Sequence, residues 1–292
     1  MSGVRQRIER RVFSVNGLSL QEFDLSQPPG DPGLYGPDSV IWRVHGDFTS
    51  MLCGGISALL LQMRHPLALA GVWDHSRFRD DMLGRLRRTS QFIAVTTFGN
   101  TADAQTLIER VRQIHLRVSG QDRDGTPYAA SDPDLLTWVH VAEAHAFLTA
   151  HLRYKNPRLS LHDQNQYYAE AARVAAALGA RAIPETVTDV ADYLQGMRPR
   201  LRYDDRTHEV TRILMNAPAP GSGPGARLAT RAFLQAGIDL LPAWAQPPAP
   251  YALSPLARRA VRAQVMALAA VLRWSIRRSA YSRAMQRMGR DF

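Results

Sequence analysis

The stretch SDPDLLTWVHVAEAHAFLTAHLR, residues 131–153, decides the fold class, because its apolar residues recur at intervals of three and four. This spacing places the apolar side chains on one face of a helix, whereas a half-buried strand alternates every two residues. Ser131 and Asp132 before Pro133 are typical of a helix start. The stretch therefore predicts a helix over 133–153.

Helical spacing continues on both sides of this stretch, and Gly and Pro residues mark the ends of segments. Gly179 predicts the end of one helix, and Pro184 predicts the start of the next segment. The run IAVTT at 93–97 is β-branched, but no hairpin series or βαβ rhythm accompanies it. We therefore expect an all-α protein with a single helical domain. The candidate helices are 50–64, 77–96, 102–118, 133–153, 162–178, 186–195, 206–214, 226–240 and 255–288.

Stretches rich in Pro and Gly at 27–37, 216–225 and 246–250 interrupt the helical pattern. They predict an N-terminal arm over 1–37 and a helical body over 38–215. A Pro/Gly-rich connection over 216–225 then leads to a basic, helical C-terminal extension over 226–292.

Composition and charge exclude several classes of protein. The 292 residues include a single cysteine, Cys53, which excludes an intramolecular disulfide and any metal site built from several cysteines. The formal net charge is +10, but residues 251–292 hold nine arginines and one acidic residue. Because basic and acidic residues nearly balance in the rest of the chain, we expect no nucleic-acid partner. With no 18-residue apolar run and no signal-like N-terminus, we expect a cytoplasmic protein.

The C-terminal segment 256–290 intersperses its arginines with apolar residues, which allows two interpretations. As a basic amphipathic helix it is suited to peripheral contact with an anionic membrane. Alternatively, it packs on the body with the arginines outward. Neither pattern specifies an oligomeric state.

Two groups of residues are candidates for chemistry. Arg85, Arg88 and Thr89 stand at i, i+3 and i+4 of a predicted helix, so they can share one face and stabilise a propionate, a phosphate or reduced dioxygen. A solvated surface explains the same spacing. His115 lies among apolar residues of the next helix, as either a core histidine or a metal ligand. No HExxH or Glu-x-x-His motif is present, which argues against zincin and carboxylate di-iron sites.

An ordered set of segments within 42–203 resembles the DUF2236 family, also called the MpaB-like or rubber-oxygenase catalytic-domain family, which includes the latex clearing proteins. The matching segments are GDFTSMLCGGISALLLQMRHPLALAGVWDHS from Gly46, GRLRRTSQFIAVTTFG from Gly84, IHLRVSG from Ile114, TPYAASDPDLLTWVHVAEAHAF from Thr126, DQNQYYAE from Asp163, IPET from Ile183 and DYLQGM from Asp192.

This resemblance implies a globin-like helical core and, as in the rubber-oxygenase branch, haem b held by a proximal histidine. His115 matches the position of that ligand, with His140 as the second choice. Arg85 and Thr89 match the distal Arg-x-x-Lys-Thr pattern of the family, whereas Arg88 replaces its lysine. Since arginine stays protonated, it cannot coordinate iron as a lysine amine can. Arg85 is also a candidate partner for a haem propionate.

The resemblance further implies that dioxygen is activated on the iron and that the substrate is hydrophobic. Apolar residues Leu60, Met63, Leu67 and Val95 are the predicted substrate pocket. The carboxylate base of the rubber-cleaving branch has no counterpart, because Leu67–Ala70 reads LALA. Two other functions therefore stay open: an inactive helical protein that binds haem or another ligand, and a peripheral membrane or interaction protein. The resemblance assigns no role to His65 or His75, for which a structural role comes first.

Overall fold

The segment after Asp132 forms α7 (Pro133–Tyr154), the helix that the sequence predicts most directly. The Asp132 side chain accepts hydrogen bonds from the backbone N–H groups of Asp134 and Leu135, at 2.9 and 3.1 Å. These bonds satisfy donors that the first helical turn leaves without partners. The start of α7 is therefore encoded by its own cap.

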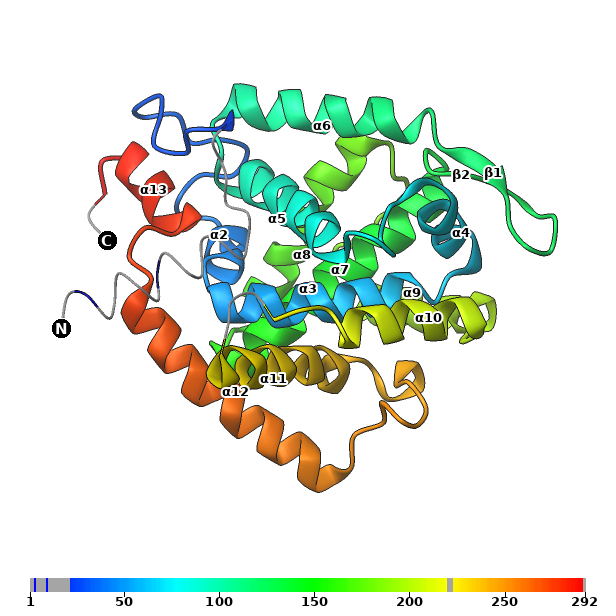
Figure 1. Cartoon of the computed structure of the whole chain (residues 1–292). Coiled ribbons are helices and arrows are strands. Elements are labelled where there is room, and N and C mark those ends of the chain that lie inside the picture. Colours follow the sequence, from blue (N-terminus) through cyan, green and yellow to red (C-terminus); the bar gives the residue numbers. More distant parts are fainter. Residues whose placement is uncertain (1–2, 4–8, 10–21, 220–222, 291–292) are drawn as a thin grey trace.

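A computed structural model describes residues 3, 9, 22–219 and 223–290 of the chain, and helices dominate this part. Figure 1 shows their arrangement around α3 and α7. The expectation of an all-α fold is confirmed. The helices are α2 (Val40–His45), α3 (Phe48–Gln62), α4 (Pro66–His75), α5 (Met82–Phe98), α6 (Thr101–His115), α7, α8 (Leu161–Leu178), α9 (Val187–Met197), α10 (Asp205–Met215), α11 (Pro224–Leu240), α12 (Pro255–Ser275) and α13 (Ala280–Arg287), with short 3-10 turns at Arg198–Arg200 and Ala243–Ala245.

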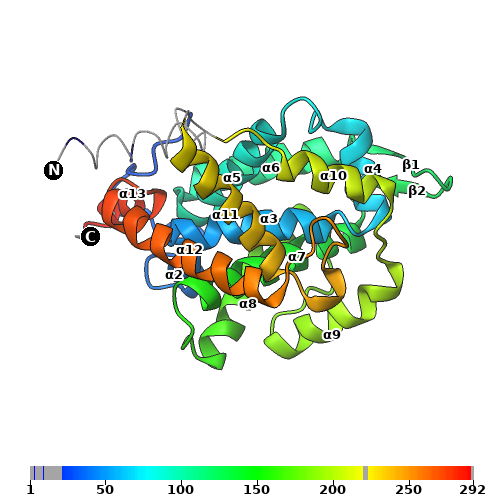
Figure 2. The same ribbon diagram turned by 60° about the horizontal axis from the view of Figure 1, so that its bottom comes forward.

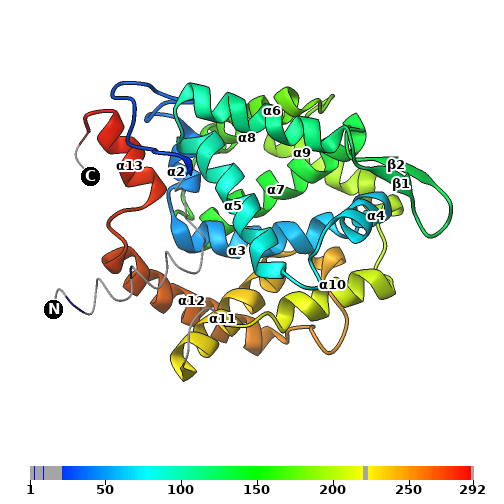
Figure 3. The ribbon, with the colours of Figure 1, turned by 45° about the horizontal axis from the view of Figure 1, so that its top comes forward.

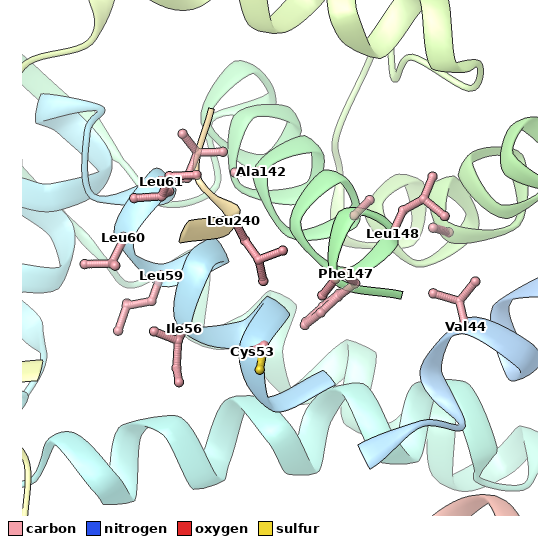
Figure 4. Close-up of a cluster of buried hydrophobic side chains, with 14 of the residues drawn as sticks. Val44, Cys53, Ile56, Leu59, Leu60, Leu61, Ala142, Phe147, Leu148 and Leu240 are labelled. Carbon is pink, nitrogen blue, oxygen red and sulfur yellow. The ribbon is translucent and has the colours of Figure 1, made fainter. Parts of the chain in front are cut away.

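The core forms where α3 and α7 pack against each other along much of their length. Figure 4 shows buried side chains of this core, including Cys53 from α3 and Phe147 from α7. Gly54 lets the two backbones approach, because a Cβ atom there would lie 2.8 Å from the Phe147 ring and 3.1 Å from the Ala146 carbonyl oxygen. The close contact between the two helices therefore explains the glycine at position 54.

Two helices form one edge of the molecule beside this core. α5 and α6 are joined by a tight turn at Gly99 and Asn100, and the Asn100 side chain caps α6 by accepting from Asp103 N–H at 2.9 Å. From this turn the two helices diverge, and α7 passes behind them (Figure 3). The inner face of α6 carries Ala104, Leu107 and Ile108, which are buried.

The sequence pattern missed two elements of this region, a helix and a short hairpin. The segment Pro66–His75 forms α4, with Pro66 in its first turn, and the His65 ring nitrogen Nδ1 accepts from Leu67 N–H at 3.3 Å. A two-stranded antiparallel hairpin, β1 (Ser119–Gln121) with β2 (Pro127–Ala129), follows α6. Each strand has only three residues, too few for the sequence pattern of alternation to appear.

The C-terminal extension is part of the same helical packing. α11 lies against α3, α12 packs on α11 and α3, and α13 contacts α5, as Figure 2 shows from below. The predicted single helix over 255–288 is broken, because α12 ends at Ser275 and the Ser279 side chain caps the start of α13. Of the predicted N-terminal arm, residues 1–2, 4–8 and 10–21 lie outside the described residues, while Phe23 and Leu25 are buried in the core.

Several arginines of the segment 256–290 form ion pairs with residues before it. Arg273 binds the Asp47 carboxylate with two nitrogens, at 2.7 and 3.0 Å, and also donates to the Tyr154 carbonyl oxygen at 2.7 Å. Arg262 forms a similar bidentate contact with buried Asp239, at 2.7 and 3.0 Å. Much of the positive charge of residues 256–290 therefore holds this segment to the protein, rather than forming a free basic surface.

Arg287 on α13 is the most deeply buried of these arginines, with 2% of its surface exposed. Its guanidinium donates to the Leu25, Asp31 and Phe98 carbonyl oxygens at 2.7–2.8 Å and to that of Gly99 at 3.2 Å. One side chain thus joins the last described helix, the segment before α2 and the turn between α5 and α6. We call this set of contacts the Arg287 clamp.

Candidate functional site

A cavity of about 170 Å³ lies between α3, α5 and α7, and the link between α12 and α13 closes one end. An engineered cavity of about 150 Å³ in another protein holds a benzene molecule, so this space can enclose an apolar group of that size. Because the space is partly open to solvent, a longer chain can extend out of it. Most of the wall is apolar. The apolar residues that line it are Phe48, Met51, Leu52, Ala58, Leu59, Leu86, Ile93, Ala94, Phe98, Phe147, Ile276 and Ala280.

A cationic side chain, Arg85, enters this wall from the first part of α5. Its Nη1 atom donates to the Ser76 hydroxyl at 3.2 Å, just before the Asp81 cap of the helix. Burial lowers the pKa of Arg85 to about 10, and the nearby positive charge of Arg88 acts in the same direction. The guanidinium is therefore still charged at neutral pH, and it can donate hydrogen bonds inside a largely apolar space.

Glu143 is the acidic group of the cavity, and it comes from the middle of α7. Burial raises its pKa to about 7, while a hydrogen bond with the Gln62 side chain and the charge of Arg85 act against this rise. Gln62, the last residue of α3, is itself positioned by donating from Nε2 to the Val139 carbonyl oxygen at 3.2 Å. Near neutral pH, Glu143 can therefore either hold or release a proton.

A histidine, His45, also lies on the cavity wall, but both of its ring nitrogens have partners. Nδ1 is 2.9 Å from the Thr97 hydroxyl oxygen, and Nε2 is 3.1 Å from the Tyr167 hydroxyl oxygen. Burial lowers the pKa of His45 to about 3, so the imidazole is neutral. With both nitrogens engaged, His45 has a positioning role between α2, α5 and α8.

The predicted catalytic group Arg85, Arg88 and Thr89 does not come together completely. Arg85 and Thr89 line the cavity, as their spacing of four residues allows. The Arg88 side chain is 63% exposed, and its Nη1 atom lies 3.6 Å from an Asp81 carboxylate oxygen. The structure therefore brings two of the three residues to one site and places the third toward solvent.

His115 is the last residue of α6, on the inner side of that helix. Burial lowers its pKa, and its Nδ1 atom is buried without a hydrogen-bond partner among the described residues. Such a neutral imidazole with an unused nitrogen fits the requirements of an axial haem ligand. His140 on α7 is also neutral, since burial lowers its pKa to about 4.

The haem that the resemblance implies requires one axial imidazole from the protein, and the unpartnered Nδ1 atom of His115 fits that requirement. His115 does not line the cavity beside Arg85, so the candidate ligand and the candidate substrate space are separate features of the described structure. In the part of the chain that the structure describes, no three His, Cys, Asp or Glu side chains gather as a set of metal ligands.

The four residues predicted for the substrate pocket are not among the residues that line this cavity. Leu60, Met63 and Val95 are buried in the main core, and Leu67 packs on a smaller cluster with Tyr128. Their neighbours Leu59 and Ala94 line the space instead. A shift of one residue turns a side chain by about 100° around a helix, enough to move it from the core to the cavity wall.

The two histidines of the first matching segment, His65 and His75, have structural contacts. His65 caps α4, and burial lowers its pKa to about 4. The Nε2 atom of His75 lies 3.2 Å from the Ser119 carbonyl oxygen on β1. These contacts agree with the structural role expected for both residues.

Sequence reasoning missed Glu143, although a signal was present. The residue interrupts a run of alanine, valine and phenylalanine on a helix predicted to be buried, and it stands three residues after His140. A carboxylate on such a helix needs a partner or a function. The position at which the resemblance places a base, Leu67–Ala70, lies on α4 instead.

A model of a known protein family matches most of the chain. Residues 42–274 match the family model described as "ER-bound oxygenase mpaB/B'/Rubber oxygenase, catalytic domain". The matched region begins in α2 and ends in α12, so it includes α11 and most of the C-terminal extension. Neither the curated proteins nor the solved structures include a match to this chain.

Proposed function

Because the chain belongs to the mpaB and rubber oxygenase catalytic-domain family, we propose that it is an oxygenase that uses haem b to act on a hydrophobic organic substrate. The observation that carries this proposal is the apolar cavity with Arg85 and Glu143 in its wall. An oxygenase for hydrophobic molecules needs such a space to exclude water and to hold the reacting group.

His115 is the residue that we propose as the axial ligand, with His140 as the alternative. Its buried, unpartnered Nδ1 atom and its lowered pKa support this assignment. When bound, haem supplies the redox chemistry with dioxygen. The protein contributes the orientation of the substrate and the placement of charge and protons.

The remaining residues have separate tasks in this proposal. Arg85, held by Ser76, presents a fixed positive charge, which would stabilise negative charge that develops as dioxygen reacts or would pair with a haem propionate. Thr89 provides a hydroxyl donor one turn further along α5. Glu143 accepts a proton from the bound molecule when ionised and returns it when neutral. Arg88 is left out of the site because of its exposure.

The test of this function is an ultraviolet–visible spectrum of protein expressed with haem precursor. The wild type is compared with His115→Ala and His140→Ala, and His75→Ala is the matched control, since His75 contacts a backbone carbonyl on β1. We expect a stoichiometric Soret band in the wild type, His140→Ala and His75→Ala, and its loss in His115→Ala. Oxygen uptake is then measured with a panel of long-chain alkenes.

Other outcomes lead to different functions. A folded wild type without a Soret band, with helicity confirmed by circular dichroism, removes haem chemistry and leaves a helical ligand-binding protein. Loss of the band only in His140→Ala moves the ligand from α6 to α7. A haem protein that consumes no oxygen with any substrate contradicts the oxygenase function but keeps the cofactor.

Peripheral membrane contact is a second function that one observation favours. The outer face of α12 exposes Leu256, Met266, Val271 and Trp274, with exposed fractions between 44% and 76%. Exposed arginines, Arg259 on α12 and Arg277 and Arg278 directly after it, lie next to this face. Apolar side chains beside cationic ones suit an anionic lipid surface. No helix among the described residues is long and apolar enough to cross a membrane.

A further inference from the structure

We propose that the cavity between α3, α5 and α7 binds a chain-like amphiphile by one uncharged polar end, such as a hydroxyl, at Gln62, Arg85 and Glu143. This inference deepens the proposed function and rests on it, because it takes this cavity as the place of the substrate. It adds a class of substrate and an orientation. Three features of the cavity lead to it.

The first feature is the elongated shape of the cavity. Its wall follows α5 from Arg85 to Phe98, a rise of about 20 Å for thirteen residues of α-helix. A volume of about 170 Å³ spread along such a length makes a narrow space. A narrow space of this kind accommodates an extended chain better than a fused ring system.

The second feature is that both charged side chains of the wall lie at one end. Arg85 and Gln62 both act on Glu143, so these three groups form that end. At the other end, the Phe98 ring packs at 5.9 Å from the Tyr281 ring beside Ile276, and the polar groups there are neutral, such as Ser279 and His45. A ligand with one polar end and an apolar chain can satisfy both ends at once, and a pure hydrocarbon cannot.

The third feature is the balance of charge at the polar end. Arg85 carries a positive charge, and Glu143 faces it as the only acidic residue of the cavity wall among the described residues. A carboxylate ligand would place a second negative charge beside Glu143, and an ammonium ligand would place a second positive charge beside Arg85. A hydroxyl donates to the Glu143 carboxylate and accepts from Arg85 or Gln62, so it adds hydrogen bonds without adding charge.

The experiment is equilibrium binding by isothermal titration calorimetry at pH 8, where Glu143 is mostly ionised. The ligands are decan-1-ol, 1-methoxynonane and decanoate, which are similar in length and differ in the polar end. We expect decan-1-ol to bind at least tenfold more tightly than either of the others. Each methylene removed from the alcohol should weaken binding by about fourfold, because about 0.8 kcal/mol of apolar burial is lost.

Two variants separate the polar end from general effects. Glu143→Gln keeps the shape but replaces the charged acceptor by an amide, so we expect about tenfold weaker binding of decan-1-ol and an unchanged affinity for 1-methoxynonane. Glu209→Gln is the control: it removes a glutamate from an exposed ion pair with Arg79 and should change neither affinity. Because the ligand series is also measured on the wild type, the test does not depend on folding of a variant.

The outcomes are distinct from those of the oxygenase test. Tighter binding of decanoate, equal binding of alcohol and ether, or no binding of any ligand overturns the inference. Oxygen uptake without a preference for polar-ended substrates contradicts the inference and leaves the oxygenase function intact. Selective alcohol binding in a protein without a Soret band keeps this site and contradicts the haem oxygenase.

Discussion

Glu143 is a carboxyl group on a helix whose neighbouring positions are alanines, and the unfolded chain would hold this group in water. Folding removes most of that water and replaces it with Gln62 and Arg85, which compensate the lost hydration only partly, so the pKa is raised to about 7. The same environment that makes the carboxyl a useful proton acceptor near neutral pH therefore reduces the stability of the fold.

The first prediction concerns the pH dependence of this cost. The unfolded side chain ionises near pH 4.5 and the folded one near pH 7, so the unfolded state binds fewer protons between these values and stability falls as pH rises through this window. Glu143→Gln removes the effect. Its stability relative to wild type should rise by roughly 3 kcal/mol between pH 4 and pH 8. Urea unfolding at both pH values measures the difference, and a constant difference would contradict the raised pKa.

Arg287 carries the second prediction at this scale. Replacing it by methionine leaves the four carbonyl oxygens of the Arg287 clamp without their donor in a buried place. We expect a loss of about 2–4 kcal/mol in the free energy of unfolding. Arg283→Met is the matched control on the same helix, since Arg283 pairs with exposed Asp24 and should contribute less than about 1 kcal/mol. If chemical denaturation shows the same loss in the free energy of unfolding for both variants, the Arg287 clamp does not stabilise the fold.

At the scale of elements, the crossing of α3 and α11 depends on close approach. A Cβ atom on Gly237 of α11 would overlap the Ile56 side chain and lie 3.2 Å from Ser57 N. Because α3 also forms a wall of the cavity, the packing of α11 on α3 helps to hold that wall in position. The close approach of α3 and α11 therefore depends on the missing side chain at Gly237, and not only on the apolar side chains of α3.

The third prediction follows from this crossing. Gly237→Ala should destabilise the protein by about 1–3 kcal/mol, although alanine favours a helix, because the added methyl forces α11 away from α3. Gly225→Ala on the same helix is the control, since open space surrounds that position, and it should be neutral or stabilising by up to about 1 kcal/mol. Thermal unfolding of both variants tests the prediction; a stabilised Gly237→Ala would show that the two helices can separate freely.

The elements also show how far sequence reasoning reaches. Helices with a clear cap were predicted closely, as for α7 after Asp132 and α8 before Gly179. α4 was missed because its cap is a histidine side chain, which is not among the usual signals. The break between α12 and α13 was missed because the apolar spacing continues across it in the sequence. The new helix start at the Ser279 cap does not interrupt that spacing.

For the candidate site, sequence reasoning identified Arg85 and Thr89 but not their true partners. Helical spacing specifies which residues of one helix share a face, so these two could be placed together. It does not specify which side of another helix faces them. Glu143 and Gln62 come from α7 and α3, and only the packing of three helices brings them to Arg85.

At the scale of the whole molecule, the arginine-rich C-terminal segment divides into two parts with different roles. Arg262, Arg273 and Arg287 hold the segment to the rest of the protein, whereas the outer face of α12 has no protein partner among the described residues. The net charge of a segment therefore does not measure the charge that it offers to a partner. Removing residues after 254 would expose the core of α11 and α3 and would not test membrane binding.

The fourth prediction addresses the outer face of α12 directly. Replacing Leu256, Met266 and Trp274 together by glutamine should weaken binding to vesicles of mixed phosphatidylcholine and phosphatidylserine by at least tenfold, because their burial in the lipid interface is lost. Ile114→Gln with Leu116→Gln is the control. Ile114 lies in the last turn of α6 and Leu116 directly after it, so these exposed apolar residues are on another part of the surface. Co-sedimentation measures both. Unchanged binding of the triple variant would exclude α12 as the contact.

The Arg287 clamp and the cavity also bear on the order of events during synthesis. Ile276, Ser279 and Tyr281 form part of the cavity wall, and α13 is held in place by Arg287. While a ribosome is still making residues before 276, α3, α5 and α7 have already emerged, but the space between them has no closed end. This end of the cavity therefore forms only after the segment from Ile276 to Tyr281 has been made and has packed beside α3 and α5. Until then the nascent chain exposes the apolar residues of that wall to the cell.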